Sequence, residues 1–305
     1  MKEYLLDNIP DITDITKIRG EASTRSFYRF KQVKSKSQIA MIYPTKNKDE
    51  INRIVKFTAL FKNNEINTPK IIETIDDRII ILEDLGTLSF QQAFNKSNKI
   101  NKKKLLDNIS TIISKLRNIS LDKTKQVLGN ERLKFEMDFF LKHYIADNLS
   151  NIDKDILQRK LYSIVDNISE EKIFSHRDFH SRNIHIFMDK IYLIDFQDSL
   201  QGPNYYDIVS FLNDSYVDLG TLRTYFFSLL KEQNIQIDKR QLYLTALQRN
   251  IKALGTFGYQ INVRKNLSYK KYTKRTLLHI ENNPEGELVY ELIQGREAER
   301  QRGRE

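Results

Sequence analysis

The sequence predicts an α+β protein of two lobes, because strand-like segments fill its first part and helical periodicity dominates the rest. Its 305 residues exceed one ordinary domain of roughly 100–200 residues. A hydrophobic content of 40% and a charged content of 30% exclude disordered and collagen-like chains. We expect a first lobe over 1–86, a helical second lobe over 87–283 and a disordered tail over 284–305, where the composition shifts to Arg, Glu, Gln and Gly.

The first lobe is predicted to be a small antiparallel sheet with one helix. β-branched and aromatic residues between turn-forming residues predict strands over 15–18, 27–33, 38–43, 69–75 and 78–82. Apolar residues then recur near the 3.6-residue period and predict a helix over 48–62. Glu83-Asp84-Leu85-Gly86 breaks the strand pattern, so we place the boundary between the lobes there.

The second lobe is predicted to be mainly helical. Apolar periodicity predicts helices near 103–118, 133–148, 153–166, 207–216, 221–233 and 239–258. Residues 184–194 form a strand-like island around the turn Met188-Asp189-Lys190, which predicts a hairpin.

Composition excludes several classes of protein. The chain has no cysteine, so disulfide scaffolds, thiol nucleophiles and cysteine-ligated metal centres are excluded. The longest apolar run, Ile79 to Leu82, is far shorter than the ~18 residues of a membrane span. The first residues lack the apolar stretch of a secretory signal, so we expect a cytoplasmic protein without membrane contact.

The net charge of +10 belongs to one segment, 239–279, which has ten bases and no Asp or Glu. The bases are Lys239, Arg240, Arg249, Lys252, Arg264, Lys265, Lys270, Lys271, Lys274 and Arg275. Aromatic residues lie between them, so this segment could bind nucleic acid, or it could be a set of solvated helix faces. It could also favour a neutral or anionic small-molecule substrate over a cationic one.

The hairpin carries a candidate metal site. With a three-residue loop at 188–190, Phe187 pairs with Ile191, and the same register sets Asn183 opposite Asp195. An amide oxygen and a carboxylate at that separation can share one Mg²⁺, which prefers oxygen ligands and substrate phosphates. The alternative is that these are a turn residue and a charge at a strand end.

Asp178 precedes the hairpin by five residues and is the candidate catalytic base. The spacing His-x-Asp-x-x-x-x-Asn over residues 176–183 matches the catalytic loop of kinases, where the Asp accepts the proton of the attacking hydroxyl. Phosphoryl transfer needs little beyond positioning and neutralisation of charge, so these groups suffice for it. A capping role for Asp178 is the alternative.

The other polar residues near this motif have weaker signals. We interpret His176, His180 and His185 as structural, because lone histidines are poor indicators of a metal. Asp198 could reach a second metal or substrate, or could hydrogen-bond the following loop. Asp207 precedes an apolar-periodic helix and is predicted to be its N-cap.

Residues 174–198 and 201–214 resemble the aminoglycoside phosphotransferase and choline kinase superfamily, which has a two-lobed, protein-kinase-like fold. The resemblance covers most of residues 15–280. Four stretches, 20–29, 82–86, 194–198 and 248–257, are most similar to the bacterial anomeric kinases of N-acetylmuramate and N-acetylglucosamine, which act in cell-wall recycling.

The resemblance implies ATP and Mg²⁺ as cofactors and a hydroxyl of a small molecule as acceptor. It implies Asp178 as catalytic base, and Asn183 and Asp195 as metal ligands. It also implies that the backbone of residues 83–86, with Glu83 and Leu85, meets adenine.

Two features depart from protein kinases. The loop over 20–27 has one glycine where protein kinases have three, although Ala22, Ser23 and Ser26 are small enough for phosphates to approach. The candidate nucleotide-binding residues there are Gly20, Ser23 and Arg25, and the alternative is that residues 20–26 are only a hairpin turn. The third strand, 38–43, has no lysine to pair with the α- and β-phosphates. Arg25 or Arg29 could replace it, because guanidinium groups bind phosphate well, or both could be solvated charges.

The predicted function is transfer of the ATP γ-phosphate to the anomeric hydroxyl of N-acetylmuramate or N-acetylglucosamine. Arg249 and Arg264 are the candidates for binding an anionic acceptor, with Lys252 as a further possibility. The alternatives are kinases of aminoglycosides, choline or other metabolites, a non-catalytic kinase-like nucleotide-binding module, and a nucleic-acid-binding protein.

Overall fold

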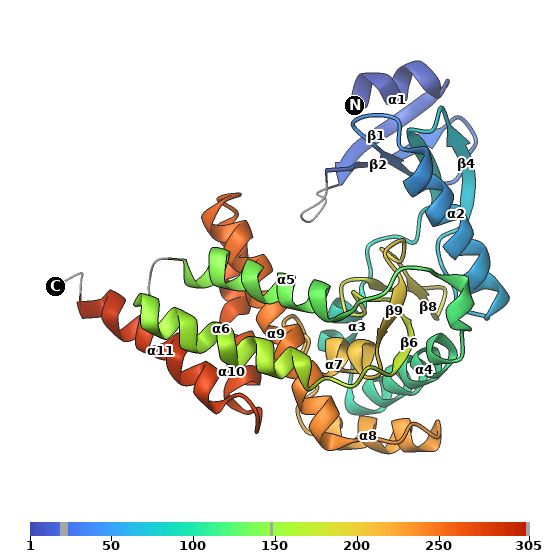
Figure 1. The fold of residues 1–305 in the computed structure, drawn as a ribbon. Helices are drawn as coiled ribbons and strands as arrows, with labels where there is room; N and C mark the ends of the chain where they lie inside the picture. Colours follow the sequence, from blue (N-terminus) through green and yellow to red (C-terminus); the bar gives the residue numbers. More distant parts are fainter. Residues whose placement is uncertain (19–23, 147–148, 303–305) are drawn as a thin grey trace. The chain divides into compact units, whose positions relative to one another are not determined.

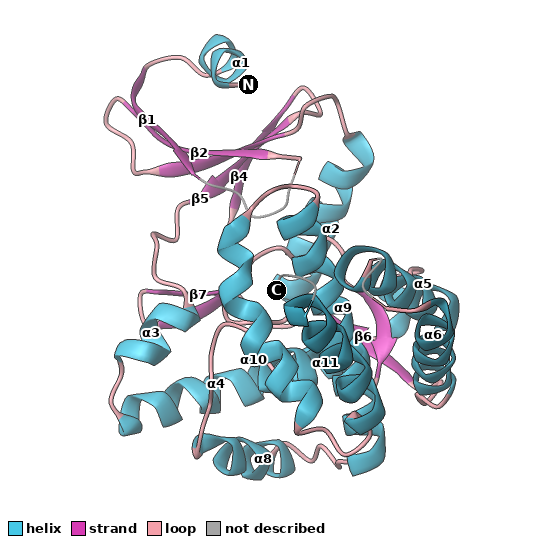
Figure 2. Ribbon diagram, turned by 90° about the vertical axis from the view of Figure 1, so that its left-hand side faces the viewer, coloured by secondary structure: helices cyan, strands magenta, loops and turns pink. Residues whose placement is uncertain are grey.

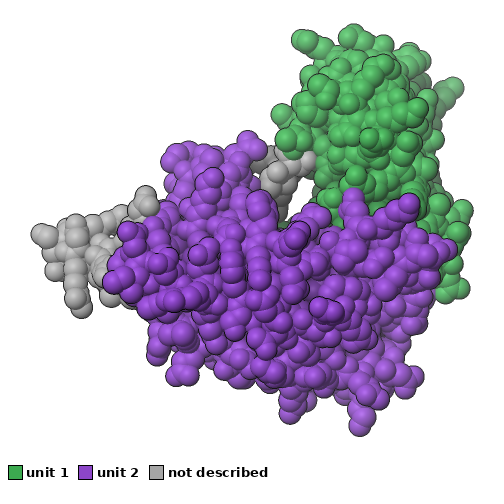
Figure 3. Space-filling view, in the orientation of Figure 1, with its two compact units in different colours: residues 1–93, 182–198 green, residues 94–181, 199–305 purple. Residues whose placement is uncertain are grey.

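The computed structural model describes residues 1–18, 24–146 and 149–302, with side chains described up to 294 (Figure 1). It divides into two compact units, which Figure 3 shows in different colours. Unit 1 comprises residues 1–93 and 182–198, and unit 2 comprises 94–181 and 199–305. The hairpin therefore belongs to unit 1, although the sequence order predicted it as part of the second lobe.

Unit 1 is a five-stranded antiparallel sheet with helices. The sheet has the order β1-β2-β3-β5-β4. Its strands are β1 (Ile12–Ile18), β2 (Ser26–Gln32), β3 (Gln38–Ile42), β4 (Ile71–Ile75) and β5 (Ile79–Glu83). The helices are α1 (Lys2–Asn8) and α2 (Lys48–Asn63), and the chain passes from unit 1 into unit 2 within α3 (Phe90–Lys96). The predicted antiparallel sheet with a helix is confirmed.

Alternating side chains explain the core of this sheet. Phe30, Ala40 and Ile81 face one side, where Leu5 of α1 packs against them. The first helix was not predicted, because its single buried residue gives no period to recognise. On α2, Ile51, Ile54, Phe57 and Phe61 are buried, and Asn47 caps the helix by accepting a hydrogen bond from the Glu50 amide.

The hairpin of unit 1 consists of β7 (Ile184–Phe187) and β8 (Lys190–Leu193) (Figure 2). The predicted register was wrong by one residue, because Phe187 pairs with Lys190 and Ile184 with Leu193. Met188 and Asp189 both have positive φ, 48° and 59°, which is typical of a two-residue type I′ turn rather than a three-residue loop.

Unit 2 is mainly helical, as predicted. Its helices are α4 (Lys99–Arg117), α5 (Asn130–Phe140), α6 (Asn151–Asp166), α7 (Tyr206–Leu212), α8 (Leu222–Glu232), α9 (Lys239–Asn262), α10 (Lys270–Glu281) and α11 (Glu287–Arg302). Shorter turns are η1 (Leu121–Lys123), the π-helical η2 (Leu141–Ile145) and η3 (Leu267–Tyr269). Strands β6 (Lys172–Ser175) and β9 (Leu200–Pro203) pair antiparallel.

Helix α9 is the centre of this unit. It packs against α5, α7, α10 and η2 and is buried on most of its surface. Two glycines allow the close approach: a Cβ at Gly255 would lie 2.9 Å from the Phe140 Cα, and one at Gly258 would lie 2.5 Å from the His143 carbonyl oxygen. The backbone of α9 therefore touches the backbone of α5 and η2 directly.

The C-terminal tail differs from the prediction of disorder. It contains α11, whose Val289 and Ile293 are fully buried in the core of unit 2. These two residues are four apart, so they share one face of a helix. Compositional reasoning missed this short apolar stripe among polar residues. Within the described residues, no helix is long and apolar enough to span a membrane.

Candidate active site

A cavity of about 630 Å³ lies within unit 1. Apolar side chains line it, namely Ile18, Phe27, Ile39, Met41, Ile54 and Leu82. The segment 83–87 and the ends of the hairpin, Asn183 and Asp195, also line it. A cavity with apolar walls and a few polar groups is typical of a nucleotide or other small-ligand site.

The segment after β5 is held by ionic contacts. Arg29 of β2 donates from Nε and Nη2 to the Asp84 carboxylate, at 2.7 and 2.9 Å, and from Nη2 to the Gly86 carbonyl oxygen at 3.1 Å. Ser37 Oγ also donates to Asp84, at 2.6 Å. Burial would raise the pKa of Asp84, but the hydrogen bonds from Arg29 and Ser37 outweigh it and lower that pKa. Arg29 thus orders the predicted adenine-binding segment of Glu83 and Leu85.

Asn183 and Asp195 both line the cavity, although they are not opposite each other. The Ile194 amide donates to the Asn183 carbonyl oxygen at 3.0 Å, so Asp195 lies one residue beyond that pair. Asp195, two residues after the end of β8, has a φ of 60° in the left-handed region. Gln197 Nε2 donates to Asp195 Oδ1 at 2.9 Å.

Asn183 and Asp195 together offer a carboxylate and an amide oxygen, the hard donors that Mg²⁺ prefers beside substrate phosphates. Among the described residues there is no group of three or more His, Cys, Asp or Glu side chains that could hold a metal. The pair therefore fits an ion that is shared with a bound phosphate.

Arg25 reaches the same cavity from the residue before β2. Its Nη2 lies 3.1 Å from Asp195 Oδ1, and its Nη1 lies 3.4 Å from Glu50 Oε1 of α2. The side chain is 12% exposed. Gly20 and Ser23, the other candidates in this loop, lie outside the described residues.

In unit 2, two buried carboxylates hold the segment that carries Asp178. Asp207 accepts hydrogen bonds from the amides of His176 and Arg177, at 2.7 and 3.0 Å. Asp214 accepts one from the Ser181 amide at 2.7 Å. Burial raises the pKa of Asp207 to about 7, and the two amide hydrogen bonds counteract that rise.

The prediction that Asp207 is the N-cap of α7 was wrong. The N-cap is Tyr205, and Asp207 lies inside the first turn of the helix. Sequence reasoning missed its role because the amides of 176 and 177 are distant in the chain. The available signal was an acid within a largely apolar helical segment, since a buried carboxylate requires partners.

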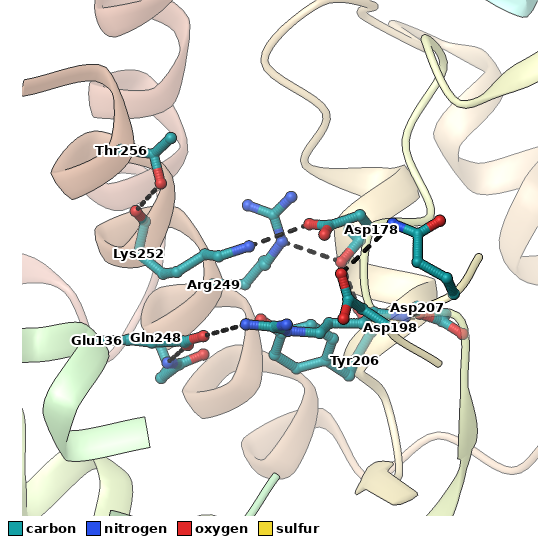
Figure 4. A network of polar contacts seen from close by, with 12 residues as sticks. Glu136, Asp178, Asp198, Tyr206, Asp207, Gln248, Arg249, Lys252 and Thr256 are labelled. Atoms are coloured by element: carbon teal, nitrogen blue, oxygen red, sulfur yellow. Dashed lines mark hydrogen bonds and ion pairs between the residues drawn. The ribbon is translucent and has the colours of Figure 1, made fainter. Parts of the chain in front are cut away.

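Asp178 lies beside two cations of α9 (Figure 4). Lys252 Nζ donates to Asp178 Oδ1 at 3.0 Å, and Arg249 lines the same cavity of about 80 Å³ while donating to Ser210 Oγ at 3.1 Å. Burial would raise the pKa of Asp178, but Lys252 and then Arg249 outweigh it and hold that pKa well below its usual value. Asp178 is therefore a carboxylate throughout the physiological pH range.

The structure brings some of the remaining candidates to these cavities and not others. Arg264 is exposed and lies over the Tyr259 ring, outside the cavity of Asp178. Asp198 belongs to unit 1, where Arg53 of α2 lies 3.6 Å from it. His176 is buried, and His180 lines the Asp178 cavity with its pKa lowered to about 3 by burial.

The two units differ in the chemistry that their cavities offer. Unit 1 offers a cavity with an oxygen donor pair and an arginine, which suits a phosphorylated ligand and its metal. Unit 2 offers an ionised carboxylate with two cations, which suits the binding of a hydroxyl compound and acceptance of its proton.

Comparisons with known proteins agree with this chemistry. Residues 14–233 match the phosphotransferase enzyme family. An N-acetylmuramate/N-acetylglucosamine kinase of Neisseria meningitidis serogroup B is 27% identical over 214 residues, which are 67% of this chain and 63% of that relative. A protein of the same name from Pseudomonas aeruginosa is 22% identical over 304 residues, which are 92% of this chain and 88% of the relative.

Among solved structures, a spectinomycin phosphotransferase in complex with ADP and spectinomycin has the same fold. It superposes with a TM-score of 0.64 at 17% identity, over 97% of each chain. The predicted protein-kinase-like architecture is thereby confirmed. On the family match over residues 14–233, this chain belongs to the phosphotransferase enzyme family.

Proposed function

We propose that this protein transfers the γ-phosphate of ATP to the anomeric hydroxyl of N-acetylmuramate or N-acetylglucosamine. The observation that carries the proposal is the pair of cations, Lys252 and Arg249, at the catalytic carboxylate Asp178. The names of the sequence relatives support the same acceptors. We place this reaction in the cytoplasm, where ATP is supplied.

The cavity of unit 1 would bind the nucleotide. Apolar side chains such as Ile39 and Leu82 would enclose the adenine ring, and the ordered backbone of 83–86 would hydrogen-bond its edge. Asn183 and Asp195 would hold Mg²⁺. The ion, when bound, neutralises charge on the phosphates.

Asp178 would bind and orient the acceptor hydroxyl. Because Lys252 and Arg249 lower its pKa, it is a weak base and accepts the proton only as the new O–P bond forms. A hemiacetal hydroxyl is more acidic than an ordinary alcohol, so such an acceptor suits a weak base. Asp207 and Asp214 would keep this carboxylate in position through the backbone of 176–181.

The charge around Asp178 also selects among acceptors. Two cations in a small cavity disfavour the ammonium groups of aminoglycosides and choline, and favour neutral or carboxylate-bearing compounds. The lactyl carboxylate of N-acetylmuramate is such a group. We therefore expect kcat/KM for N-acetylmuramate to exceed that for N-acetylglucosamine.

The test is acceptor-dependent release of ADP from Mg·ATP, measured separately with N-acetylmuramate, N-acetylglucosamine, kanamycin and choline. Wild-type protein should turn over the two sugars, and Asp178→Asn should lose at least a hundredfold in kcat. Asp189→Asn, an exposed turn residue of the hairpin that has positive φ, is the matched control and should behave as wild type.

Turnover of kanamycin or choline alone would contradict the proposed acceptor class. Nucleotide binding without turnover of any acceptor would instead favour a non-catalytic binding module. A salt-dependent gel shift with RNA or DNA, carried by the basic segment 239–279, would favour the nucleic-acid alternative.

A further inference from the structure

The third strand of the sheet has a methionine in the nucleotide cavity where a phosphate-binding lysine would serve. Met41 of β3 pairs with Phe27 on β2 and Ile80 on β5, and its side chain lines the cavity of unit 1. A thioether carries no charge, so this strand supplies nothing to neutralise the phosphates of a nucleotide.

Arg25, the residue before the neighbouring strand β2, supplies a charge at that place. Its Nη1 lies 3.7 Å from Met41 Sδ, so the guanidinium stands at the tip of this uncharged side chain. Its Nη2 lies 3.1 Å from Asp195, the proposed metal ligand. The cation is therefore beside the groups that would hold Mg²⁺ and the phosphates.

Glu50 holds the other side of the guanidinium. Its Oε1 lies 3.4 Å from Arg25 Nη1, and its Oε2 accepts a hydrogen bond from Asn47 Nδ2 at 3.1 Å. Because Asn47 also caps α2, Glu50 is fixed at the first turn of that helix. In protein kinases a strand lysine pairs with a helix glutamate in the same manner.

Two other arginines line the cavity and are engaged elsewhere. Arg29 is bound to Asp84 and Gly86, and Arg182 Nε donates to Gln91 at 3.3 Å. Arg25 is bound to Asp195 and Glu50. Arg25 therefore differs from the other two arginines by its position beside Asp195, the proposed metal ligand.

We propose that Arg25 binds the nucleotide phosphates in place of the strand lysine, and that Glu50 is the positioning residue that holds it there. Arg25 rests on Asp195 without nucleotide and exchanges this carboxylate for phosphate oxygens when Mg·ATP binds. This inference rests on the proposed ATP-dependent function, and it assigns a residue that the sequence left open between Arg25 and Arg29.

The experiment measures affinity for ADP and for adenosine by isothermal titration calorimetry, with Mg²⁺ and with EDTA. Arg25→Ala should weaken ADP binding ten- to a hundredfold in both conditions and leave adenosine binding unchanged, because a charged hydrogen bond to phosphate is lost. Lys56→Ala, an exposed cation of α2, is the matched charge control and should bind ADP as wild type does.

A second-site variant tests the position of the charge. In Arg25→Ala/Met41→Lys, the new ammonium would reach the place of the lost guanidinium, and ADP affinity should return to within a few-fold of wild type. Glu50→Gln should weaken ADP binding in wild type and have no further effect in Arg25→Ala, since its contribution passes through Arg25.

Unchanged ADP affinity in Arg25→Ala, in a protein whose wild type turns over acceptor, overturns the inference and leaves the proposed function standing. Absence of ADP binding in wild type overturns both. Arg25→Ala could weaken adenosine binding as much as ADP binding. In that case the double variant decides: restored ADP affinity supports the inference, and unrestored ADP affinity overturns it.

Discussion

Among single residues, Lys252 contributes most to keeping Asp178 ionised, because its charge lowers the pKa of that carboxyl. Burial of Asp178 raises its pKa, and the nearby cations, with Lys252 at 3.0 Å first and Arg249 second, together lower it more. Neither partner is fully buried, with 17% of the Lys252 side chain and 30% of Asp178 exposed. Both the base strength of Asp178 and the selection of acceptors therefore depend on Lys252 together with Arg249.

The first prediction follows from this pair. Lys252→Met should raise the pKa of Asp178, so the acid limb of the kcat/KM profile, where Asp178 becomes protonated and inactive, should move to higher pH. Lys274→Met, which removes an exposed charge from α10, is the control and should leave the profile in place. An unshifted acid limb in Lys252→Met would contradict the assigned role.

Asp207 gives a prediction about stability at the same scale. Its pKa is raised by burial from 3.8 to about 7 in the folded state. The unfolded chain therefore loses this proton at lower pH than the folded chain, and stability falls as pH rises from about 4 to 7. Asp207→Asn has no such proton, so the Tm of wild type should fall relative to that of the variant across this window. If the calorimetric Tm values of wild type and Asp207→Asn change in parallel between pH 4 and 7, the raised pKa of Asp207 is contradicted.

Helix α9 determines the site at the scale of elements, because it bears both Arg249 and Lys252 and touches the backbone of α5 and η2. Apolar periodicity over 239–258 predicted this helix, and the spacing of the 176–183 motif predicted the loop with Asp178. Neither pattern predicted the register of the hairpin, because a two-residue turn at Met188 and Asp189 and a three-residue loop have the same strand pattern on either side.

A glycine variant tests the close approach of α9. Gly258→Ala would place a Cβ 2.5 Å from the His143 carbonyl oxygen, where backbone rather than a flexible side chain must move. We expect a loss of about 1–3 kcal/mol in the free energy of unfolding, as is usual for overpacking. Denaturant unfolding measures this free energy. An unchanged unfolding midpoint would contradict the prediction, because the backbone of η2 would then have moved away from the new Cβ without cost.

At the scale of the whole molecule, sequence reasoning predicted most of the order of strands and helices, and failed where distant residues cooperate. The pairing of Arg25 with Glu50 and of Asp207 with the 176–177 backbone joins residues far apart in the chain. Local patterns contain no record of such contacts. The prediction for the tail failed for a different reason. The polar composition of 284–305 predicted disorder, and the helical spacing of Val289 and Ile293, which are buried in the core, was overlooked.

Nucleotide binding should stabilise the molecule as a whole. At a hundred times its Kd, ADP adds about 2.7 kcal/mol to the free energy of unfolding, which we expect to appear as a Tm increase of several degrees in the presence of Mg²⁺. With EDTA the increase should be smaller, because Asn183 and Asp195 lose the ion that they share with the phosphates. Equal increases with Mg²⁺ and EDTA would contradict the assigned metal site.

The most direct test of the central claim is the position of the phosphate on the product. N-acetylglucosamine is incubated with Mg·ATP and wild-type protein, and the product is examined by ³¹P and ¹H NMR, with the methyl glycoside as an acceptor that lacks a free anomeric hydroxyl. We predict a phosphorus signal coupled to H1 of the sugar and no product from the glycoside. Phosphate on another hydroxyl, or equal turnover of the glycoside, would contradict the account.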